Sequence, residues 1–124
     1  MEISKTYIAN IYVGTRPGYN DIHDHLLISN KQKIISICQK YCDDVGLGLT
    51  VTDTEFIYTN GNEPGIIVGL INYPRFPATR IEIKATAIDL AKILLKELKQ
   101  ERLSIVLSDE TIMIEKEDLW QSSI

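Results

Sequence analysis

The residues best suited to ligand chemistry gather in one short segment, 72–77, which reads Asn-Tyr-Pro-Arg-Phe-Pro. Its two prolines fix their own φ and restrict the residues before them, so less motion is lost when the segment engages a ligand. Phe76 offers a flat face to a nucleobase, and Arg75 could stack on it or grip a phosphate through a fork of N–H donors. Arg102, which follows a predicted helix, could reach the same edge. The segment predicts a small-molecule site, although a core role for Phe76 and a solvated charge at Arg102 are the alternatives.

Recognised catalytic patterns are missing from the sequence. There is no Gly-x-Ser-x-Gly elbow and no glycine-rich phosphate loop. Two His and two Asp lie within residues 21–25 and invite a metal interpretation, but ligands usually converge from separate elements, so a surface loop or a short helical turn is favoured. The carboxylates at turns and strand ends single out no acid–base pair. The sequence therefore predicts a binding protein that is not an enzyme and that has no metal and no cofactor.

Composition narrows the range of partners. The formal net charge is −4 and the 13 Lys and Arg are spread along the chain, which argues against a surface for duplex nucleic acid. Cys38 and Cys42 lie four apart on a predicted helix and are expected to be reduced core thiols. No signal region and no apolar run of membrane-spanning length is present. These features predict a single domain, residues 1–124, that is soluble and cytoplasmic.

Hydrophobic periodicity locates two helices and the strand before them. Alternation over residues 5–15 predicts a first strand with Ala9, Ile11 and Val13 on one face. A first helix is expected to begin at Ser29 or Asn30 and to end before Gly46. A second helix is expected to open with a capping box formed by Thr79 and Glu82, with Gln100 facing mostly outward at its end.

The remaining strands are predicted from β-branched and aromatic runs. Residues 47–58 form one strand with a bulge or break near 52–55. Asn60-Gly61 predicts a turn that Glu63-Pro64-Gly65 lengthens beyond the two-residue kind. The apolar run 66–71 predicts a strand covered on both faces, and two more strands are expected at 103–107 and 111–114. Trp120, in the tail, is expected to cap the core or an oligomer contact.

The resulting order, β-α-β-β-α-β-β, favours an α+β two-layer sandwich. The sheet is expected to be mostly antiparallel, with both helices on one face. Tyr7, Phe56, Tyr58 and the run 66–71 supply more apolar surface than one bare sheet face should expose. A symmetric homo-oligomer is therefore predicted.

Several segments together carry a resemblance to a known family. The chain resembles the first type of phage Thoeris anti-defence proteins over nearly its whole length. The segments concerned are 11–14 (Ile-Tyr-Val-Gly) with Gly18-Tyr19 and Asp21, 39–47 (Gln-Lys-Tyr-Cys-Asp-Asp-Val-Gly-Leu), 54–65 (Thr-Glu-Phe-Ile-Tyr-Thr-Asn-Gly-Asn-Glu-Pro-Gly), 72–77 and 109–113 (Asp-Glu-Thr-Ile-Met). The chain departs from the family pattern at Thr15-Arg16 and at Gly48-Leu49.

The resemblance implies a sponge for an immune signal. Such proteins bind the cyclic ADP-ribose isomer that Thoeris TIR-domain proteins make from NAD, and they leave it intact. It also implies a homodimer or higher oligomer in the host bacterial cytoplasm during infection, with cyclic oligonucleotides as a further ligand class. Carried over by position, adenine would stack near Phe76 and Arg102, the diphosphate would meet Arg75, and the wall would consist of Asn72, Tyr73 and Thr111.

Two other classes stay open on the sequence. One is a small oligomeric α+β enzyme with a carboxylate or His at an interface. The other is a metabolite-binding regulatory module of the ferredoxin-like kind.

Overall fold

The computed structural model describes residues 1–15, 24–74 and 77–121. Its elements follow the predicted order, with a short third helix added at the end. They are β1 (Ile8–Gly14), α1 (Asp24–Val45), β2 (Thr50–Tyr58), β3 (Gly61–Ile71), α2 (Arg80–Glu97), β4 (Arg102–Leu107), β5 (Thr111–Glu115) and α3 (Asp118–Gln121).

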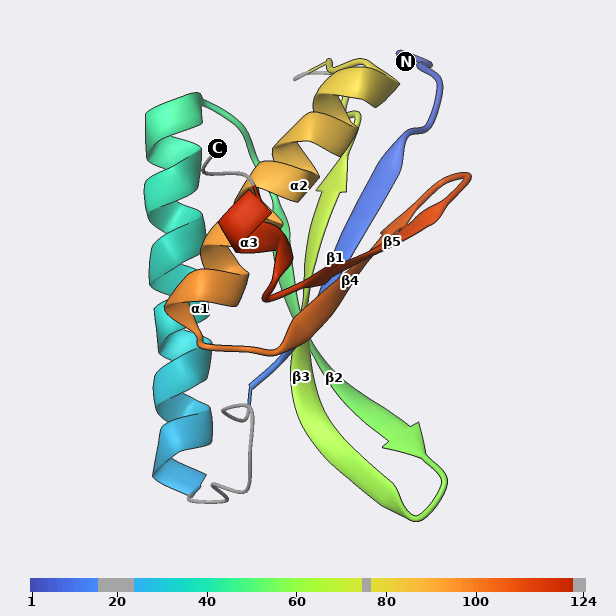
Figure 1. Cartoon of the computed structure of the whole chain (residues 1–124). Helices are drawn as coiled ribbons and strands as arrows, with labels where there is room; N and C mark the ends of the chain where they lie inside the picture. The colour runs from blue at the N-terminus through green and yellow to red at the C-terminus, as the bar shows by residue number, and fades with distance from the viewer. Residues whose placement is uncertain (16–23, 75–76, 122–124) are drawn as a thin grey trace.

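The five strands form one antiparallel sheet in the order β2-β3-β1-β4-β5. Strands β1 and β2 run parallel with β3 between them, and β3 and β4 run parallel with β1 between them. Helices α1 and α2 make these two crossovers and lie on the same side of the sheet (Figure 1). The arrangement is the split β-α-β of ferredoxin-like folds with β5 added at one edge. The predicted two-layer α+β sandwich is confirmed.

The core lies between the helices and one face of the sheet. Ala9, Ile11 and Val13 of the central strand β1 are fully buried, as the alternation predicts. Helix α2 covers β1 and β4 most closely and buries a full stripe. Helix α1 adds Ile34 and Cys38. The α2 stripe consists of Ile83, Ala87, Leu90, Ala91, Leu94 and Leu95.

Local sequence signals predicted the start of α2 and the end of α1 correctly, but not the start of α1. The Thr79 hydroxyl accepts a hydrogen bond from the Glu82 amide, and the Glu82 carboxylate accepts one from the Thr79 amide, so the predicted capping box opens α2. Gly46 ends α1 with a φ of +78°, also as predicted. The predicted start of α1 is wrong, because the helix already begins at Asp24. Asn30 does not cap it; its side-chain amide donates to the Thr15 carbonyl at 2.5 Å.

The β2–β3 hairpin is more regular than predicted. Its register runs without interruption from Thr50 opposite Gly69 to Tyr58 opposite Gly61, so the bulge expected near 52–55 is absent. The turn is the two-residue Thr59-Asn60, with Asn60 at a φ of 62°, which Asn tolerates. The expected longer connection is wrong because Pro64 lies inside β3. The strand accepts it because β1 has already ended at Gly14, so no ladder bond needs the missing N–H.

The face of the sheet opposite the helices is the less covered one. On β3, Ile66, Val68 and Leu70 are buried under the helices, while Ile67 is half-buried and Ile71 is 36% exposed. The prediction that residues 66–71 are covered on both faces is therefore wrong for a single chain. The register places Ile8, Tyr12, Ile67, Ile71, Val106 and Met113 together on this helix-free face.

Aromatic side chains cover glycines at the outer end of this face. A Cβ at Gly65 would overlap the Phe56 ring and would lie 2.9 Å from the Val13 carbonyl oxygen. The Phe56 and Tyr12 ring centroids are 6.3 Å apart. Glycine is therefore required at position 65 for the ring of the neighbouring strand to lie flat across the sheet.

Candidate functional site

The predicted ligand segment begins where β3 ends, and Asn72 holds that point in place. The Asn72 amide nitrogen donates to the Tyr7 carbonyl at 3.0 Å, and its side-chain nitrogen donates to the Lys5 carbonyl at 2.7 Å. Its side-chain oxygen accepts from the Ala78 amide at 2.8 Å. Asn72 thus ties the N-terminal segment to the start of α2. Arg75 and Phe76, the two strongest sequence candidates, lie outside the described residues.

Tyr73 lines a cavity of about 370 Å³ beside this segment. The walls come from the α1–β2 connection (residues 45–48), the end of β3, and the first two turns of α2, where Glu82 and Thr86 contribute polar atoms. A volume of this order suits a small ligand, and mostly apolar walls with a few polar groups are typical of such sites. The cavity can enclose the apolar part of a ligand while Tyr73 contacts a polar edge.

Thr111 lies at the same end of the sheet, held there by ion pairs between α2 and the β4–β5 turn. Arg80 contacts Asp109 at 2.8 Å and Glu110 at 2.7 Å, and Lys84 contacts Glu110 at 3.0 Å. The hydrogen bond from Arg80 holds the pKa of Asp109 below its ordinary value, and the hydrogen bonds from Lys84 and Arg80 do the same for Glu110. The Ile8 amide also donates to the Ser108 hydroxyl, which joins the turn to β1.

Arg102 lies at the opposite end of the sheet from the other candidates. It begins β4, whereas Leu107, at the end of that strand, pairs with Ala9 near the Asn72 edge. Continuing the β1–β4 register from Tyr12 opposite Ser104 places Arg102 beside Gly14. Within one chain, Asn72, Tyr73 and Thr111 lie at one end of the sheet and Arg102 at the other, and the strands β1 and β4 separate Thr111 on β5 from the end of β3.

Polar side chains surround the Arg102 end of the sheet. A Cβ at Gly14 would lie 3.3 Å from the Gln100 side-chain oxygen and 4.0 Å from the Glu63 carboxylate oxygens. The expectation that Gln100 faces outward is wrong, since only 9% of it is exposed. Lys99 takes a φ of 54° after α2 and turns the chain back, so that the Gln100 amide donates to the Leu95 carbonyl. A helical periodicity extended past the last turn could not reveal this reversal.

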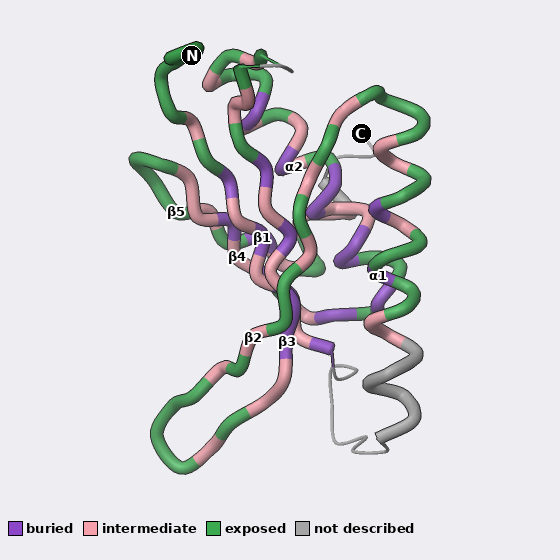
Figure 2. The backbone as a smooth tube through the Cα atoms, turned by 180° about the vertical axis from the view of Figure 1, so that it is seen from behind, coloured by how far each residue is buried: buried purple, intermediate pink, exposed green. Residues whose placement is uncertain are grey.

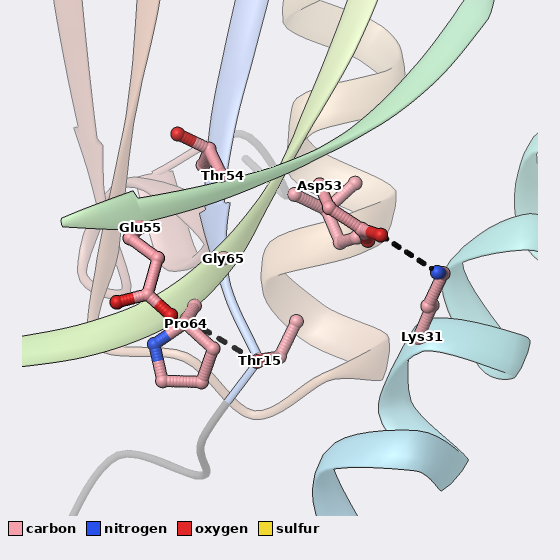
Figure 3. A pocket seen from close by; sticks show the side chains of 8 residues that line it. Thr15, Lys31, Asp53, Thr54, Glu55, Pro64 and Gly65 are labelled. Atoms are coloured by element: carbon pink, nitrogen blue, oxygen red, sulfur yellow. Dashed lines mark hydrogen bonds and ion pairs between the residues drawn. The ribbon is translucent and has the colours of Figure 1, made fainter.

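A second cavity, of about 530 Å³, lies beneath the base of the β2–β3 hairpin (Figure 3). Lys31 of α1 reaches Asp53 of β2 at 3.0 Å, and Glu55 lies beside Pro64 on the same side of the hairpin. The Thr15 hydroxyl and amide both donate to the Pro64 carbonyl and close the floor. Sequence reasoning missed this hollow, because Lys31 and Asp53 meet only through the packing of a helix against an edge strand.

Metal-ligand clusters and membrane-spanning helices are both absent from the described part of the chain. Residues 1–15, 24–74 and 77–121 contain no group of three or more His, Cys, Asp or Glu side chains that could hold a metal ion. Asp21 and His23, two of the four Asp and His residues within 21–25, lie outside the described residues. Among the helices of the described ranges, none has the length and apolar character required to cross a membrane. Both cysteines are free thiols, with Cys38 buried.

Comparison with known proteins gives a match at the level of structure. No family model matches the sequence, and no curated protein matches it. The solved structure of a phage SAM lyase in complex with S-methyl-5'-thioadenosine superposes with a TM-score of 0.67 at 16% identity, covering 90% of this chain and 91% of that one. A phage SAM lyase in its apo state gives a TM-score of 0.60 at 15% identity, with 90% of each chain covered. The chain has the fold of a phage SAM lyase.

This match corrects one inference from the sequence. The inference that the protein is not an enzyme does not hold, because it rested on missing motifs while the fold is shared with a lyase. A motif search detects chemistry only when the reacting groups are close in sequence, whereas an antiparallel sheet assembles groups from separate strands. In this chain the fold likewise places oxygen atoms of Glu63 and Gln100, which are far apart in the sequence, close to Gly14.

Proposed function

We propose that this protein is a phage protein that binds an adenosine-containing small molecule, and that its ligand is the cyclic ADP-ribose isomer made by Thoeris TIR-domain proteins. The observation that carries the proposal is the bound S-methyl-5'-thioadenosine in a lyase of the same fold. That molecule and a cyclic ADP-ribose isomer share an adenosine moiety. The resemblance to Thoeris anti-defence proteins supports a cyclic ADP-ribose isomer as the molecule that carries this adenosine.

The site proposed for this ligand lies at the end of the sheet where β3 reaches Asn72. The three hydrogen bonds of Asn72 fix the start of segment 72–77, and Tyr73 borders the cavity of about 370 Å³. Adenine stacks on Phe76 and the diphosphate is gripped by Arg75, because planar guanidinium groups bind phosphate oxygens in pairs. Thr111, beside the ion-paired β4–β5 turn, belongs to the proposed site at the same end of the sheet, although β1 and β4 separate its strand from β3.

The same proposal includes a homo-oligomer. Thr111 and Arg102 lie at opposite ends of the β4–β5 hairpin, so a site that uses both draws Arg102 from a second copy. The helix-free face supports association, because Ile8 and Ile71 are each 36% exposed and Met113 is 55% exposed on it. Apolar side chains gathered on one sheet face favour contact with another protein surface.

A capture-and-release experiment tests the function. The purified protein is mixed with the product of a TIR-domain NAD cyclase, freed of unbound ligand, heated, and the supernatant is examined by mass spectrometry. Recovery of an intact cyclic ADP-ribose isomer at one molecule per site is the expected result. Recovery of fragments alone would replace capture with cleavage, and recovery of nothing would overturn the proposed ligand.

Matched variants locate the site. Tyr73→Ala and Arg102→Ala are expected to weaken capture at least about tenfold, whereas Ile35→Ala, on the exposed face of α1, is expected to leave it unchanged. Thermal unfolding of each variant shows whether the fold is retained. Equal capture by all three variants would move the site away from the Asn72 edge.

A second function, lyase activity on S-adenosylmethionine, is favoured by the same neighbour. Removal of a β-proton of the methionine moiety by a carboxylate base, with formation of a Cβ–Cγ double bond, would break the bond between the sulfonium sulfur and Cγ. The sulfur would keep the bonding electrons, and the products would be S-methyl-5'-thioadenosine, the molecule bound in that lyase, and an unsaturated amino acid. The Glu63 carboxylate, half-buried beside Gly14 and Gln100, is the group we assign to this chemistry. Incubation with S-adenosylmethionine is expected to yield S-methyl-5'-thioadenosine in the wild type and not in Glu63→Gln. Unchanged substrate with the wild type would exclude this function.

A further inference from the structure

Strand β2 presents a long unpaired edge. It lies at one end of the sheet, its nine residues contain no proline and no lysine, and its register with β3 has no bulge. Natural edge strands are usually protected by one of these devices, by charged side chains or by being short, because free N–H and C=O groups pair readily with another strand. The charges of β2 are Asp53, which is paired with Lys31, and Glu55, whereas residues 56–58 carry none. Nothing among the described residues pairs with the outer edge of β2.

The pairing of Pro64 identifies which backbone groups face outward. Pro64 has no N–H, and its carbonyl accepts from the Thr15 amide on the β1 side. Its partner across the β2–β3 ladder, Glu55, therefore exchanges no hydrogen bond with it. The N–H and C=O of Glu55 point away from the sheet, and by the two-residue period so do those of Val51, Asp53 and Ile57.

The outer half of β2 also lies clear of the helices. Residues 55–63 form an arm that extends away from the body of the protein, and Figure 2 shows it mostly exposed or half-buried (Figures 1 and 2). Ile57 is 80% exposed and Tyr58 is 56% exposed, and they lie on opposite faces of the arm. An apolar residue on each face of a free strand suits a partner that continues the sheet.

We propose that a second copy of this chain pairs through β2, antiparallel, about a two-fold axis at Phe56. This register places Glu55 opposite Ile57 of the second copy, Thr54 opposite Tyr58, and the two Phe56 residues opposite each other. Aromatic and β-branched cross-strand pairs are stabilising, and no like charges are opposed.

Other registers are less favourable because they oppose like charges or leave apolar side chains exposed. An axis at Thr54 opposes Asp53 and Glu55, and an axis at Glu55 opposes the two Glu55 carboxylates. An axis at Thr52 avoids like charges but leaves Ile57 and Tyr58 exposed. The Phe56 axis extends the contact between Tyr12 and Phe56 into a row of four rings across the joined sheet.

A charge-swap experiment tests the register. Ile57→Glu places a carboxylate opposite Glu55 of the partner, and Ile57→Lys places an ammonium there, while both remove the same apolar side chain. Sedimentation equilibrium over a concentration series is expected to give a dimer of the Lys variant at least about tenfold tighter than that of the Glu variant. The difference is expected to shrink at about 1 M salt, where the Debye length is roughly 3 Å. Ile35→Glu, on the exposed face of α1, is the control and is expected to match the wild type.

Cross-linking tests the axis independently. In a Cys42→Ser background, Phe56→Cys is expected to form a disulfide with its own symmetry mate, because Cβ atoms in directly opposed pairs lie about 4.5–5.5 Å apart. Thr52→Cys, on the same face of the same strand, is expected not to. If removal of the Phe56 ring loosens the arm, the double variant Thr54→Cys, Tyr58→Cys reports the same register. A wild type that stays monomeric, equal weakening by Glu and Lys, or cross-linking at position 52 would each overturn the proposal.

Discussion

Replacing Asn72 with Ala removes two side-chain hydrogen bonds. The Asn72 side chain donates to the Lys5 carbonyl at 2.7 Å and accepts from the Ala78 amide at 2.8 Å. Both distances are those of well-formed bonds. The residue is half-buried, so its loss removes the link between the N-terminal segment and the start of α2 and leaves the partly buried Ala78 amide without its acceptor.

The size of the effect follows from these two bonds. Each contributes about 0.5–1.5 kcal/mol net, so Asn72→Ala is expected to cost about 2 kcal/mol. For 124 residues the unfolding entropy is roughly 0.26 kcal/mol/K, which converts that loss into a decrease of about 8 °C in Tm. Asn72→Asp keeps an acceptor for Ala78 but loses the donor to Lys5, so about half the loss is expected.

Two measurements test the positioning role of Asn72. Urea denaturation gives the free energy of unfolding of the wild type and both variants, and amide hydrogen exchange reports on Ala78. Exchange at Ala78 is expected to accelerate in Asn72→Ala and to stay slow in Asn72→Asp. An Asn72→Ala protein with wild-type stability and a protected Ala78 amide would refute the positioning role assigned to Asn72.

Three further predictions test packing and electrostatics. Gly65→Ala is expected to cost about 1–3 kcal/mol relative to Gly48→Ala in urea denaturation, because a Cβ at Gly65 meets the Val13 carbonyl and one at Gly48 meets nothing within 4 Å; equal stabilities would contradict this. Burial first, and then the neighbouring Cys42 thiol, raises the pKa of Cys38 to about 11. Alkylation of Cys38 at pH 8, followed by mass spectrometry, is therefore expected to be at least about tenfold slower than that of free glutathione, and a similar rate would refute its burial. Arg80 lowers the pKa of Asp109, so their pairing stabilises the protein above the ordinary pKa of 3.8 and is lost as the pH falls through the lower folded value. Arg80→Ala should thus lower the urea midpoint at pH 7 but hardly at pH 2, and an equal decrease at both would refute the ion pair.

The parts of the fold predicted correctly are those with local causes. The capping box at Thr79 and Glu82 and the glycine that ends α1 each depend on residues within one helical turn, so sequence spacing reveals them. The start of α1 was mispredicted because Asn30 binds the Thr15 carbonyl, a contact between elements. The hairpin turn was misplaced by one residue, since Asn60 and not Gly61 takes the second turn position.

The candidate site was predictable only where it is contiguous. Segment 72–77 is recognisable from its aromatic, cationic and proline content, and the structure describes its start at the end of β3. Thr111 lies at the same end of the sheet as Asn72, and Arg102 lies at the opposite end. Both positions depend on strand register, which the sequence does not specify. Lys31 and Asp53 meet across a helix and an edge strand, so no spacing rule connects them.

The position of β1 has a consequence for how the chain folds during synthesis. The strand of this sheet that is synthesised first, β1, becomes its middle strand, and its two neighbours, β3 and β4, begin about fifty and ninety residues later. Ala9, Ile11 and Val13 therefore stay without their native neighbours until most of the chain has been made. At about 5–20 residues per second that wait lasts roughly five to twenty seconds. The hairpin of β2 and β3, closed by a two-residue turn, needs no earlier strand and is the first piece of the sheet that can form, giving β1 a template to join.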